Sequence, residues 1–456
     1  MFVDFGYKFE VYVYKFEVIE HKFGNYEHNF LVAKDTTICG IKQVLSEVFQ
    51  LFFVTLHKFS STKQKQMIQL KENQGIPRSM LLMMAVVAGF TVANCYYNQP
   101  LLELIRNDIG ISEQHANLIT VITQIGYALG LCFIIPMGDL FSRRRIVVIN
   151  MLMAASMAVI IGVARNVWMI WGASLIIGAS SVIPQIFIPI AGQFSTPENK
   201  SRNMGIVLSG LLTGILASRV MSGLIGEWFG WREMFFIAAV LMVICMIVTL
   251  LMLPEMKRNF EGTYPQLMFS VWKIFSTSPL IRLYSARAAF GFGSMLAIWS
   301  CMAFHLAGAP FHAGSDMVGL LGVCGIAGAV IAGDMGKYVP RFGIRRFSIV
   351  GALLQIAAWL IAYLFWDSYI GLIVAIILVD IGLQCQQLSN QSGCIQQVPN
   401  AANRANTIFM TTYFIGGSVG TFFAGIGWEI AGWLGVSIVG CTFALCSLAI
   451  TVFSNK

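Results

Sequence analysis

Long apolar runs, separated by short polar or charged stretches, follow one another from residue 81 to residue 453. A helix needs about 20 apolar residues to cross the roughly 30 Å hydrocarbon core of a bilayer. Hydrophobic residues make up 57% of the chain and charged residues only 11%, which excludes a soluble domain of this length. We therefore predict a membrane protein with twelve spans: 81–105, 115–137, 146–164, 168–193, 203–226, 233–253, 281–306, 317–338, 346–365, 369–391, 404–427 and 433–453.

A short charged loop between two of these runs occurs twice. The first copy reads Gly138-Asp139-Leu140-Phe141-Ser142-Arg143-Arg144-Arg145. The second runs from Gly336 to Arg346, and its Pro340 stands 201 residues after Asp139. Charges of this density are too costly for hydrocarbon, so both loops are expected at a membrane surface. A repeat of this length indicates two related halves.

After the second span and again after the eighth, the chain has a glycine-containing loop with clustered arginines, and the first copy adds an acidic residue. This motif resembles the signature of the major facilitator superfamily of transporters. The resemblance covers roughly residues 80 to 453 and is nearest to bacterial twelve-span proteins of the drug-efflux and sugar-efflux kind. The first copy departs from the pattern at Ile135 and the second at Pro340. The family implies an all-α membrane protein of two pseudo-symmetric six-helix halves that works by alternating access.

Four segments are expected: an extension over 1–79, a six-helix half over 80–253, a cytoplasmic linker over 254–280 and a second half over 281–456. Tyr7-Lys8-Phe9-Glu10-Val11 recurs as Tyr14-Lys15-Phe16-Glu17-Val18, a repeat without a functional explanation. The extension lacks the features of a signal peptide. It is either a misassigned start or a real module, and residues 41–59 would form an amphipathic helix at the interface.

The distribution of basic residues predicts the topology. Loops on the side of the N-terminus hold most of the basic residues: Arg143, Arg144, Arg145, Lys200, Arg202, Lys257, Arg258, Lys273, Lys337, Arg341, Arg345, Arg346 and Arg404. Loops on the opposite side offer mainly Arg106, Arg165 and Arg232. Cytoplasmic loops are enriched in Lys and Arg. Both termini are therefore expected in the cytoplasm, in a bacterial inner membrane, and the net charge of +8 reflects these loops rather than nucleic-acid binding.

The loop arginines and Asp139 are candidates for gating. By resemblance to the family, Asp139 with Arg143 and Arg144 would hold the cytoplasmic side closed through charge-assisted hydrogen bonds. Arg341, Arg345 and Arg346 would act in the second copy. The alternative is that these arginines only set the topology.

Three ionisable residues lie inside predicted spans and are candidates for proton coupling: Asp380, Arg219 and Arg287. An ionisable group within a membrane is a functional candidate because it is costly unless paired or hydrated. Asp380 is the carboxylate nearest the middle of a span, which makes it the first candidate for a proton site. Alternatively, Asp380 and Arg287 form a static pair. Arg219 could attract an anionic group or extend toward the outer surface.

Other polar residues in the spans are candidates for lining a substrate cavity: Asn94, Tyr97, Asn98, Gln99, Gln185, Gln384, Gln391, Asn406 and Tyr413. Several stand beside Pro100, Pro184 or Pro189, where interrupted helices are tolerated if they face protein or water. Individual members of this set could instead make hydrogen bonds between helices.

Small residues recur at a spacing of four in the fifth and eleventh spans. The candidate packing residues are Gly210, Gly214, Ser218, Ser222, Gly416 and Gly420, and Gly416 follows Gly214 by 202 residues. Such faces allow close helix contact. The fifth span also resembles a glycine-rich bending motif of antiporter branches, with Ser218-Arg219 in place of the usual Gly-Pro. Close packing alone is the alternative.

No enzyme, cofactor or metal site is expected. His305 and His312 have no third ligand near them in the sequence, and no nucleotide-binding glycine loop, haem or flavin motif occurs. The sequence predicts a monomeric secondary transporter whose partners are protons, a small organic molecule and the bilayer, with export the favoured direction. The alternatives are uptake or facilitated diffusion of a metabolite, and a transporter fold that serves as a membrane sensor or scaffold.

Overall fold

The computed structural model describes residue 70 and the ranges 72–196, 198–256, 262–325, 343–398 and 401–454. Within these residues the regular structure is helical, without strands. The predicted extension up to residue 69 and the part of the second charged loop that contains Gly336, Pro340 and Arg341 lie outside the described residues.

Residues 78–252 form a bundle of antiparallel helices. Its elements are α3 (Arg78–Ala93), α4 (Asn98–Ile109), α5 (Glu113–Leu129), a π-helical turn (Gly130–Ile134), α6 (Ile135–Leu140), α7 (Arg143–Val163), α8 (Val167–Ser180), α9 (Pro184–Phe194), α10 (Lys200–Trp228) and α11 (Trp231–Met252). The pairs α3 with α4 and α8 with α9 each make one broken span, and α5 continues through the π turn into α6.

The second bundle follows a short connecting helix, α12 (Tyr264–Thr277). Its elements are α13 (Pro279–Ala307), α14 (Ser315–Leu321), a 3-10 turn (Gly322–Cys324), α16 (Ile344–Leu364), α17 (Tyr369–Gln397) and α18 (Ala402–Phe453). The backbone of α18 leaves helical geometry at Ala431 and Gly432, where Gly432 has a φ of +56°. A conformation of this kind favours glycine because it lacks a Cβ.

Ten helices in the described residues are long and apolar enough to cross a membrane. The break in α18 separates the predicted spans 404–427 and 433–453, so these ten account for eleven of the twelve predicted segments. The remaining segment, 317–338, begins in α14 and continues beyond the described residues. The predicted membrane protein with an all-α fold is therefore confirmed, while the count of twelve stays a prediction.

Part of the linker expected over 254–280 is the helix α12. The side chain of Gln266 accepts a hydrogen bond from the backbone N–H of Thr263 at 2.9 Å, which satisfies a donor at the start of the helix. Pro265 stands in the first turn, where its missing N–H costs nothing. The linker thus has a rigid element that reaches both bundles, since Tyr264 bonds Phe133 O and Arg404 bonds Ser270.

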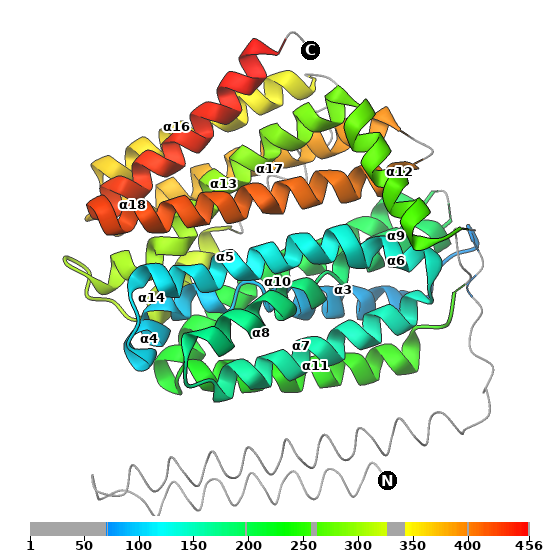
Figure 1. Ribbon diagram of the computed structural model, residues 1–456, viewed down its shortest axis with the longest axis horizontal. Coiled ribbons are helices and arrows are strands. Elements are labelled where there is room, and N and C mark those ends of the chain that lie inside the picture. Colours follow the sequence, from blue (N-terminus) through cyan, green and yellow to red (C-terminus); the bar gives the residue numbers. More distant parts are fainter. Residues whose placement is uncertain are drawn as a thin grey trace, which may run out of the picture. The chain divides into compact units, whose positions relative to one another are not determined.

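Two ends of the helical unit can be told apart (Figure 1). We call the end with α6, α9 and α12 the linker side, and the end with α4, α14 and the break in α18 the far side. The helices of residues 78–252 lie together, and α13, α16, α17 and α18 lie together beside them. The two bundles meet along α5 with the first part of α18 and along α10 with α14.

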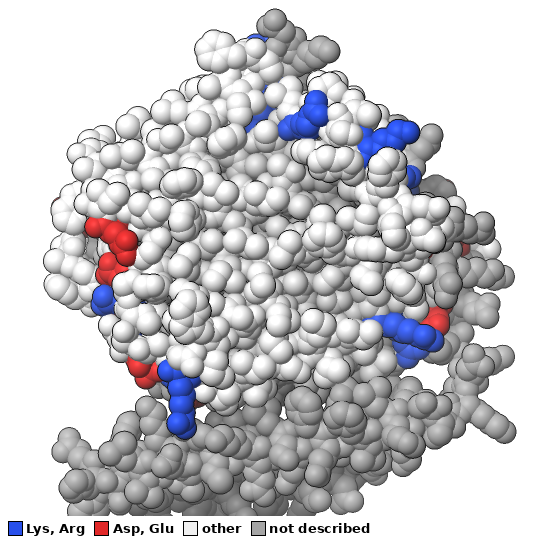
Figure 2. Space-filling view, in the orientation of Figure 1, with Lys and Arg blue, Asp and Glu red and all other residues white. Residues whose placement is uncertain are grey.

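The outer surface of the helical unit is apolar between the two ends. Figure 2 shows charged side chains near the ends of the helices and a broad uncharged area between them. Large apolar side chains such as Leu82, Ile149, Leu251 and Ile438 are exposed there. A continuous apolar surface of this kind suits the hydrocarbon of a bilayer.

Glycines bring two pairs of helices into backbone contact. A Cβ added at Gly210 would strike Ala85 O, and one at Gly214 would strike the backbone of Gly89, so α10 lies directly on α3. Gly416 and Gly420 of α18 meet the backbone of α13 in the same way. Ser218 and Ser222 are buried farther along α10. The repeat seen in the sequence therefore corresponds to two equivalent helix contacts.

We predict that Gly214→Ala destabilises the protein, because its new methyl group would overlap the Gly89 backbone, which has no rotamer to change. Overpacking of this kind typically costs about 1–3 kcal/mol. Gly205 lies on the same helix with no atom within 4 Å of an added Cβ. Gly205→Ala is the matched control and should leave the melting temperature in detergent unchanged or higher. Equal melting temperatures for the two variants would contradict the close contact.

Candidate functional site

Two helices are broken at mid-depth. Between α3 and α4 the backbone turns through Asn94–Tyr97, and between α8 and α9 it turns through 181–183. Pro100 and Pro184 follow the turns; each lacks the N–H that a continuous helix would use. The turns bring Tyr96, Gln99 and Gln185 to the inner surface of the bundle.

A cavity of about 410 Å³ lies between the two bundles. Its polar lining comprises Tyr96, Tyr127, Gln185, Ser209, Arg219, Asp380, Gln384, Gln387, Gln391 and Tyr413. Apolar side chains from both bundles complete it, including Leu212, Phe292, Met295 and Phe414. The volume and the few convergent polar groups are those of a site for a small organic molecule.

Arg219 of α10 is the cation in this lining and is only 2% exposed. Its Nε donates to Gln99 Oε1 at 2.9 Å, and its guanidinium lies over the Trp299 ring at 4.0 Å and the Tyr96 ring at 5.2 Å. Its buried Nη2 has no hydrogen-bond partner among the described residues. Cation–π contacts shielded from water stabilise a cation by about 2 kcal/mol or more, which offsets part of its burial cost.

Asp380 of α17 is the carboxylate in the described lining and is 9% exposed. It interacts electrostatically with Arg219 across the interface between the bundles but makes no ion pair or hydrogen bond with a described residue. The alternative of a static pair with Arg287 is wrong. Arg287 is fully buried near the linker side, where it bonds Ser454 and lies over the Tyr284 ring at 5.7 Å.

Four of the predicted lining residues face the cavity: Gln185, Gln384, Gln391 and Tyr413. Gln99 lies behind it and holds Arg219. The others serve helix contacts. Asn94 bonds Thr91 O and the sulfur of Met242, Asn98 bonds Thr123 and Thr120, and Asn406 accepts from Gln391 at 2.7 Å.

Tyr97 points away from the cavity. It lines a separate groove between α3 and α10 with Val86, Phe90 and Met221. Tyr96 and Tyr97 are adjacent in the turn, yet Tyr96 faces the cavity and Tyr97 does not. The sequence pattern could not distinguish the two because the turn has no helical periodicity.

Sequence reasoning selected Tyr413 but missed four other aromatic side chains of the site: Tyr127, Phe292, Trp299 and Phe414. The rings of Tyr127 and Phe414 meet across the two bundles at 4.2 Å, and Phe292 stacks on Tyr413 at 3.9 Å. Trp299 supports Arg219. Aromatic residues are common in apolar spans, so only tertiary packing separates these from aromatic residues that face lipid.

Direct hydrogen bonds between the described parts of the bundles lie toward the far side. Ser315 donates from its N and Oγ to Glu227 at 2.9 and 3.2 Å, and Asn117 donates to Thr421 O at 2.8 Å. Trp428 donates to Glu113 at 2.5 Å. These contacts close the far side, whereas the cavity extends toward the linker side along α10, where Leu208 and Ser209 are exposed.

The arginines of the first loop bind within their own bundle. Arg143 lies 3.5 Å from Asp139 and donates to Gln193 at 2.8 Å, and Arg144 donates to Leu250 O at 2.5 Å. In the second copy Arg345 donates to Val452 O at 2.8 Å. Arg144 and Arg345, 201 residues apart, thus bond the ends of equivalent helices, and both Arg345 and Arg346 are exposed.

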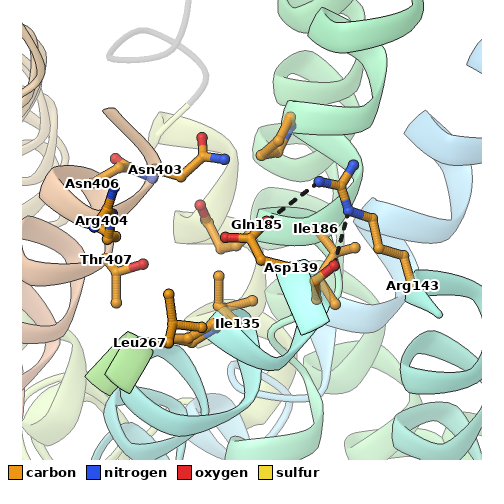
Figure 3. A pocket seen from close by; sticks show the side chains of 13 residues that line it. Ile135, Asp139, Arg143, Gln185, Ile186, Leu267, Asn403, Arg404, Asn406 and Thr407 are labelled. Carbon is orange, nitrogen blue, oxygen red and sulfur yellow. Dashed lines mark hydrogen bonds and ion pairs between the residues drawn. The ribbon is translucent and has the colours of Figure 1, made fainter. Parts of the chain in front are cut away.

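A narrow cleft of about 40 Å³ lies beside Asp139 on the linker side. In Figure 3, Asp139 and Arg143 lie on one side, and Asn403, Arg404, Asn406 and Thr407 of α18 lie across from them, with Leu267 of α12 below. A water molecule needs roughly 10–15 Å³ of such space, so the cleft has room for a few waters but not for an organic substrate. Gln185 borders both the cleft and the cavity.

The described residues contain no cluster of three His, Cys, Asp or Glu side chains that could hold a metal ion. His305 contacts Trp366 O at 2.8 Å and stacks on Trp433 at 4.0 Å. Its ring is therefore part of an aromatic cluster on the far side.

The family model of the Major Facilitator Superfamily matches residues 81–421. The protein named "Uncharacterized transporter YgaY" of Escherichia coli O157:H7 is 34% identical over 83% of this chain and 96% of its own length. The Streptomyces coelicolor protein named "Probable transporter SCO4007" is 31% identical over 79% of this chain and 84% of its own.

Solved structures share the fold. The nucleoside transporter NupG has a TM-score of 0.65 at 14% identity, covering 83% of this chain and all of that one. A bacterial homologue of the human lysosomal transporter Spinster, described as inward-facing and unoccupied, has a TM-score of 0.62 at 18% identity over 82% of this chain and 94% of its own. At these identities the likeness shows the fold alone.

The cavity predicts a difference in thiol accessibility along the bundle. A cysteine at position 209 stands on the exposed, cavity-lining part of α10, whereas one at position 315 is enclosed by the far-side contacts. In detergent, Ser209→Cys should react with a charged maleimide at least about tenfold faster than Ser315→Cys, since the second reaction requires opening of the far side. The wild type measures the background from native cysteines. Equal rates would show that the far side is not closed.

Proposed function

The chain belongs to the major facilitator superfamily, and on that premise we propose that it is a proton-coupled exporter of a small organic molecule that works by alternating access. One observation supports the proposal above others. A cavity between the two bundles has a single described carboxylate, Asp380, opposite a buried arginine. A carboxylate that is neither paired nor hydrogen-bonded can gain and lose a proton without breaking a structural contact.

In the proposed mechanism Asp380 binds either a proton or a cationic group of the substrate. Either occupant compensates the buried carboxylate of Asp380, which no described residue pairs, whereas the empty, ionised form leaves that carboxylate without a direct partner among the described residues. The bundles therefore change orientation when the site is occupied, which exchanges protons for substrate. Among the described residues, the titratable groups that interact with Asp380 besides Arg219 are Tyr413 from α18 and Cys324 from the 3-10 turn, and Tyr96 lines the same cavity.

Rocking of the two bundles would open the far side and close the linker side. The far-side bonds Ser315 to Glu227, Asn117 to Thr421 and Trp428 to Glu113 would break in the opposite state. The cleft at Asp139 would then close against α18. Arg143 and Arg144, which now hold α9 and α11, keep the first bundle rigid during the motion.

We propose that the linker side faces the cytoplasm in the inner membrane and that both termini are cytoplasmic. Arg143, Arg144, Arg145, Lys273, Arg282, Arg345, Arg346 and Arg404 lie there, against Arg106, Arg165 and Arg232 on the far side. This bias follows the positive-inside rule. Export is favoured by the resemblance to drug-efflux and sugar-efflux proteins. The cavity needs no second chain, so the functional unit is a monomer.

The proposal predicts that Asp380→Asn uncouples transport. Purified protein is reconstituted in liposomes with a pH-sensitive dye inside and supplied with lipophilic cations, sugars, amino acids and organic acids. An active compound should move protons in the wild type, and Asp380→Asn should reduce that movement to the level of empty liposomes because an amide cannot carry a proton. Asp316→Asn changes a carboxylate on the far side, outside the cavity, and should behave as the wild type.

Other outcomes separate the alternatives. Substrate flux without proton movement in the wild type would mean facilitated diffusion and overturn the coupling. Unchanged proton movement in Asp380→Asn would remove Asp380 from the mechanism. Binding without flux for every compound would favour a sensor or scaffold.

A further inference from the structure

The cavity contains two opposite charges that do not bind each other. Arg219 and Asp380 both line it and interact electrostatically, yet no ion pair joins them. They flank one turn of backbone. A Cβ added at Gly322 would lie 3.0 Å from the Arg219 Cβ, and one added at Gly325 would lie 3.1 Å from Asp380 Oδ2. Buried opposite charges that are near each other normally pair, so the separation requires an explanation.

Arg219 is prepared for a planar anion. A guanidinium has five N–H donors, and here one of them, on Nε, binds Gln99. Nη2 is buried and has no partner in the part of the chain that the structure describes. Gln99 and the Trp299 ring fix the orientation of the group, so the entropy of ordering it has already been lost. A carboxylate matches a guanidinium edge with two parallel hydrogen bonds.

Asp380 is prepared for a cation that donates hydrogen bonds. Its oxygens accept from no described side chain or backbone group. Because Asp380 is 9% exposed, acceptor sites that no described residue fills can be satisfied by a ligand or a proton. A protonated amine has three donors and a compact charge, which suits a single carboxylate in a confined space.

Apolar side chains form part of the walls of the cavity that holds the two charges. Phe292, Met295 and Phe414 line the same cavity, together with Leu212 and Ile215 of α10. They offer dispersion contacts and no specific hydrogen bonds, so they accept an apolar body without fixing its shape. Recognition by charge would then come from Arg219 and Asp380 alone.

We propose that the transported molecule is a zwitterion with an apolar body, of the α-amino acid kind. Its carboxylate binds Arg219 and its protonated amine binds Asp380. The inference rests on the proposed transport function and specifies its substrate class. It also accounts for exchange with protons, because the amine and a proton compete for Asp380 while Arg219 selects molecules that bring a carboxylate.

The test compares three compounds that share one apolar body. L-phenylalanine has both charged groups, 2-phenylethylamine only the amine, and 3-phenylpropanoate only the carboxylate. A second series of L-leucine, isopentylamine and 4-methylpentanoate changes the body. Binding to the purified full-length protein in detergent is measured by calorimetry. In each series the zwitterion should bind at least about tenfold more tightly than either partner compound, the factor that about 1.4 kcal/mol corresponds to.

Variants assign the two contacts. In Arg219→Gln the zwitterion should bind no better than the amine, and in Asp380→Asn no better than the acid. Arg219→Lys keeps a cation and should keep part of the preference for the zwitterion, which separates loss of charge from loss of folding. Asp316→Asn, outside the cavity, should keep the full preference. Melting temperatures of all variants verify that they are folded.

If the amine binds as tightly as the zwitterion, the proposed role of Arg219 is overturned. If the acid binds as tightly as the zwitterion, the proposed role of Asp380 is overturned. Absence of binding in both series would overturn the proposal as a whole. These failures differ from failure of the transport function. A cation that drives proton movement without zwitterion preference leaves proton coupling intact, whereas zwitterion binding without proton movement leaves the site intact and removes the coupling.

Discussion

Backbone contact between helices positions Arg219 and the aromatic side chains of the cavity. Gly210 and Gly214 let α10 lie on α3, and this contact sets Arg219 beside Gln99 and Tyr96 at the break before α4. Gly416 and Gly420 do the same for α18 on α13, which places Tyr413 and Phe414 against Phe292. A larger residue at these positions would push the two helices apart. The charged side chains would then no longer face the cavity in the same way.

The two halves repeat their packing but not their chemistry. Arg144 with Leu250 O and Arg345 with Val452 O are equivalent bonds, as are the two pairs of glycine contacts. The buried charges have no such counterparts, because the position 202 residues after Arg219 is Thr421 and the position 202 before Asp380 is Gly178. Symmetric packing thus supports a site of low symmetry, which is what a molecule with two different charged ends requires.

Particular residues show how far sequence reasoning reaches. The breaks at Tyr96 and Pro184, the paired glycines and the isolated charges Arg219 and Asp380 could all be found without a structure. The pairing of Asp380 with Arg287 could not be excluded, since both lie in the same half of the chain. The helix α12 was also missed because its cap, Thr263 with Gln266, lies in a loop of mixed composition.

The sequence by itself determined the membrane fold, the number of related halves and the loops that carry charge. The reason is that the thickness and low polarity of the bilayer core constrain the length and composition of each span separately. Only the tertiary structure decided which polar residues share a cavity. Tyr96 faces it while Tyr97 does not, and Asn98 binds Thr123 while Gln99 holds Arg219. These differences depend on the tilt and rotation of each helix, which are set by packing against neighbours rather than by any pattern along one chain.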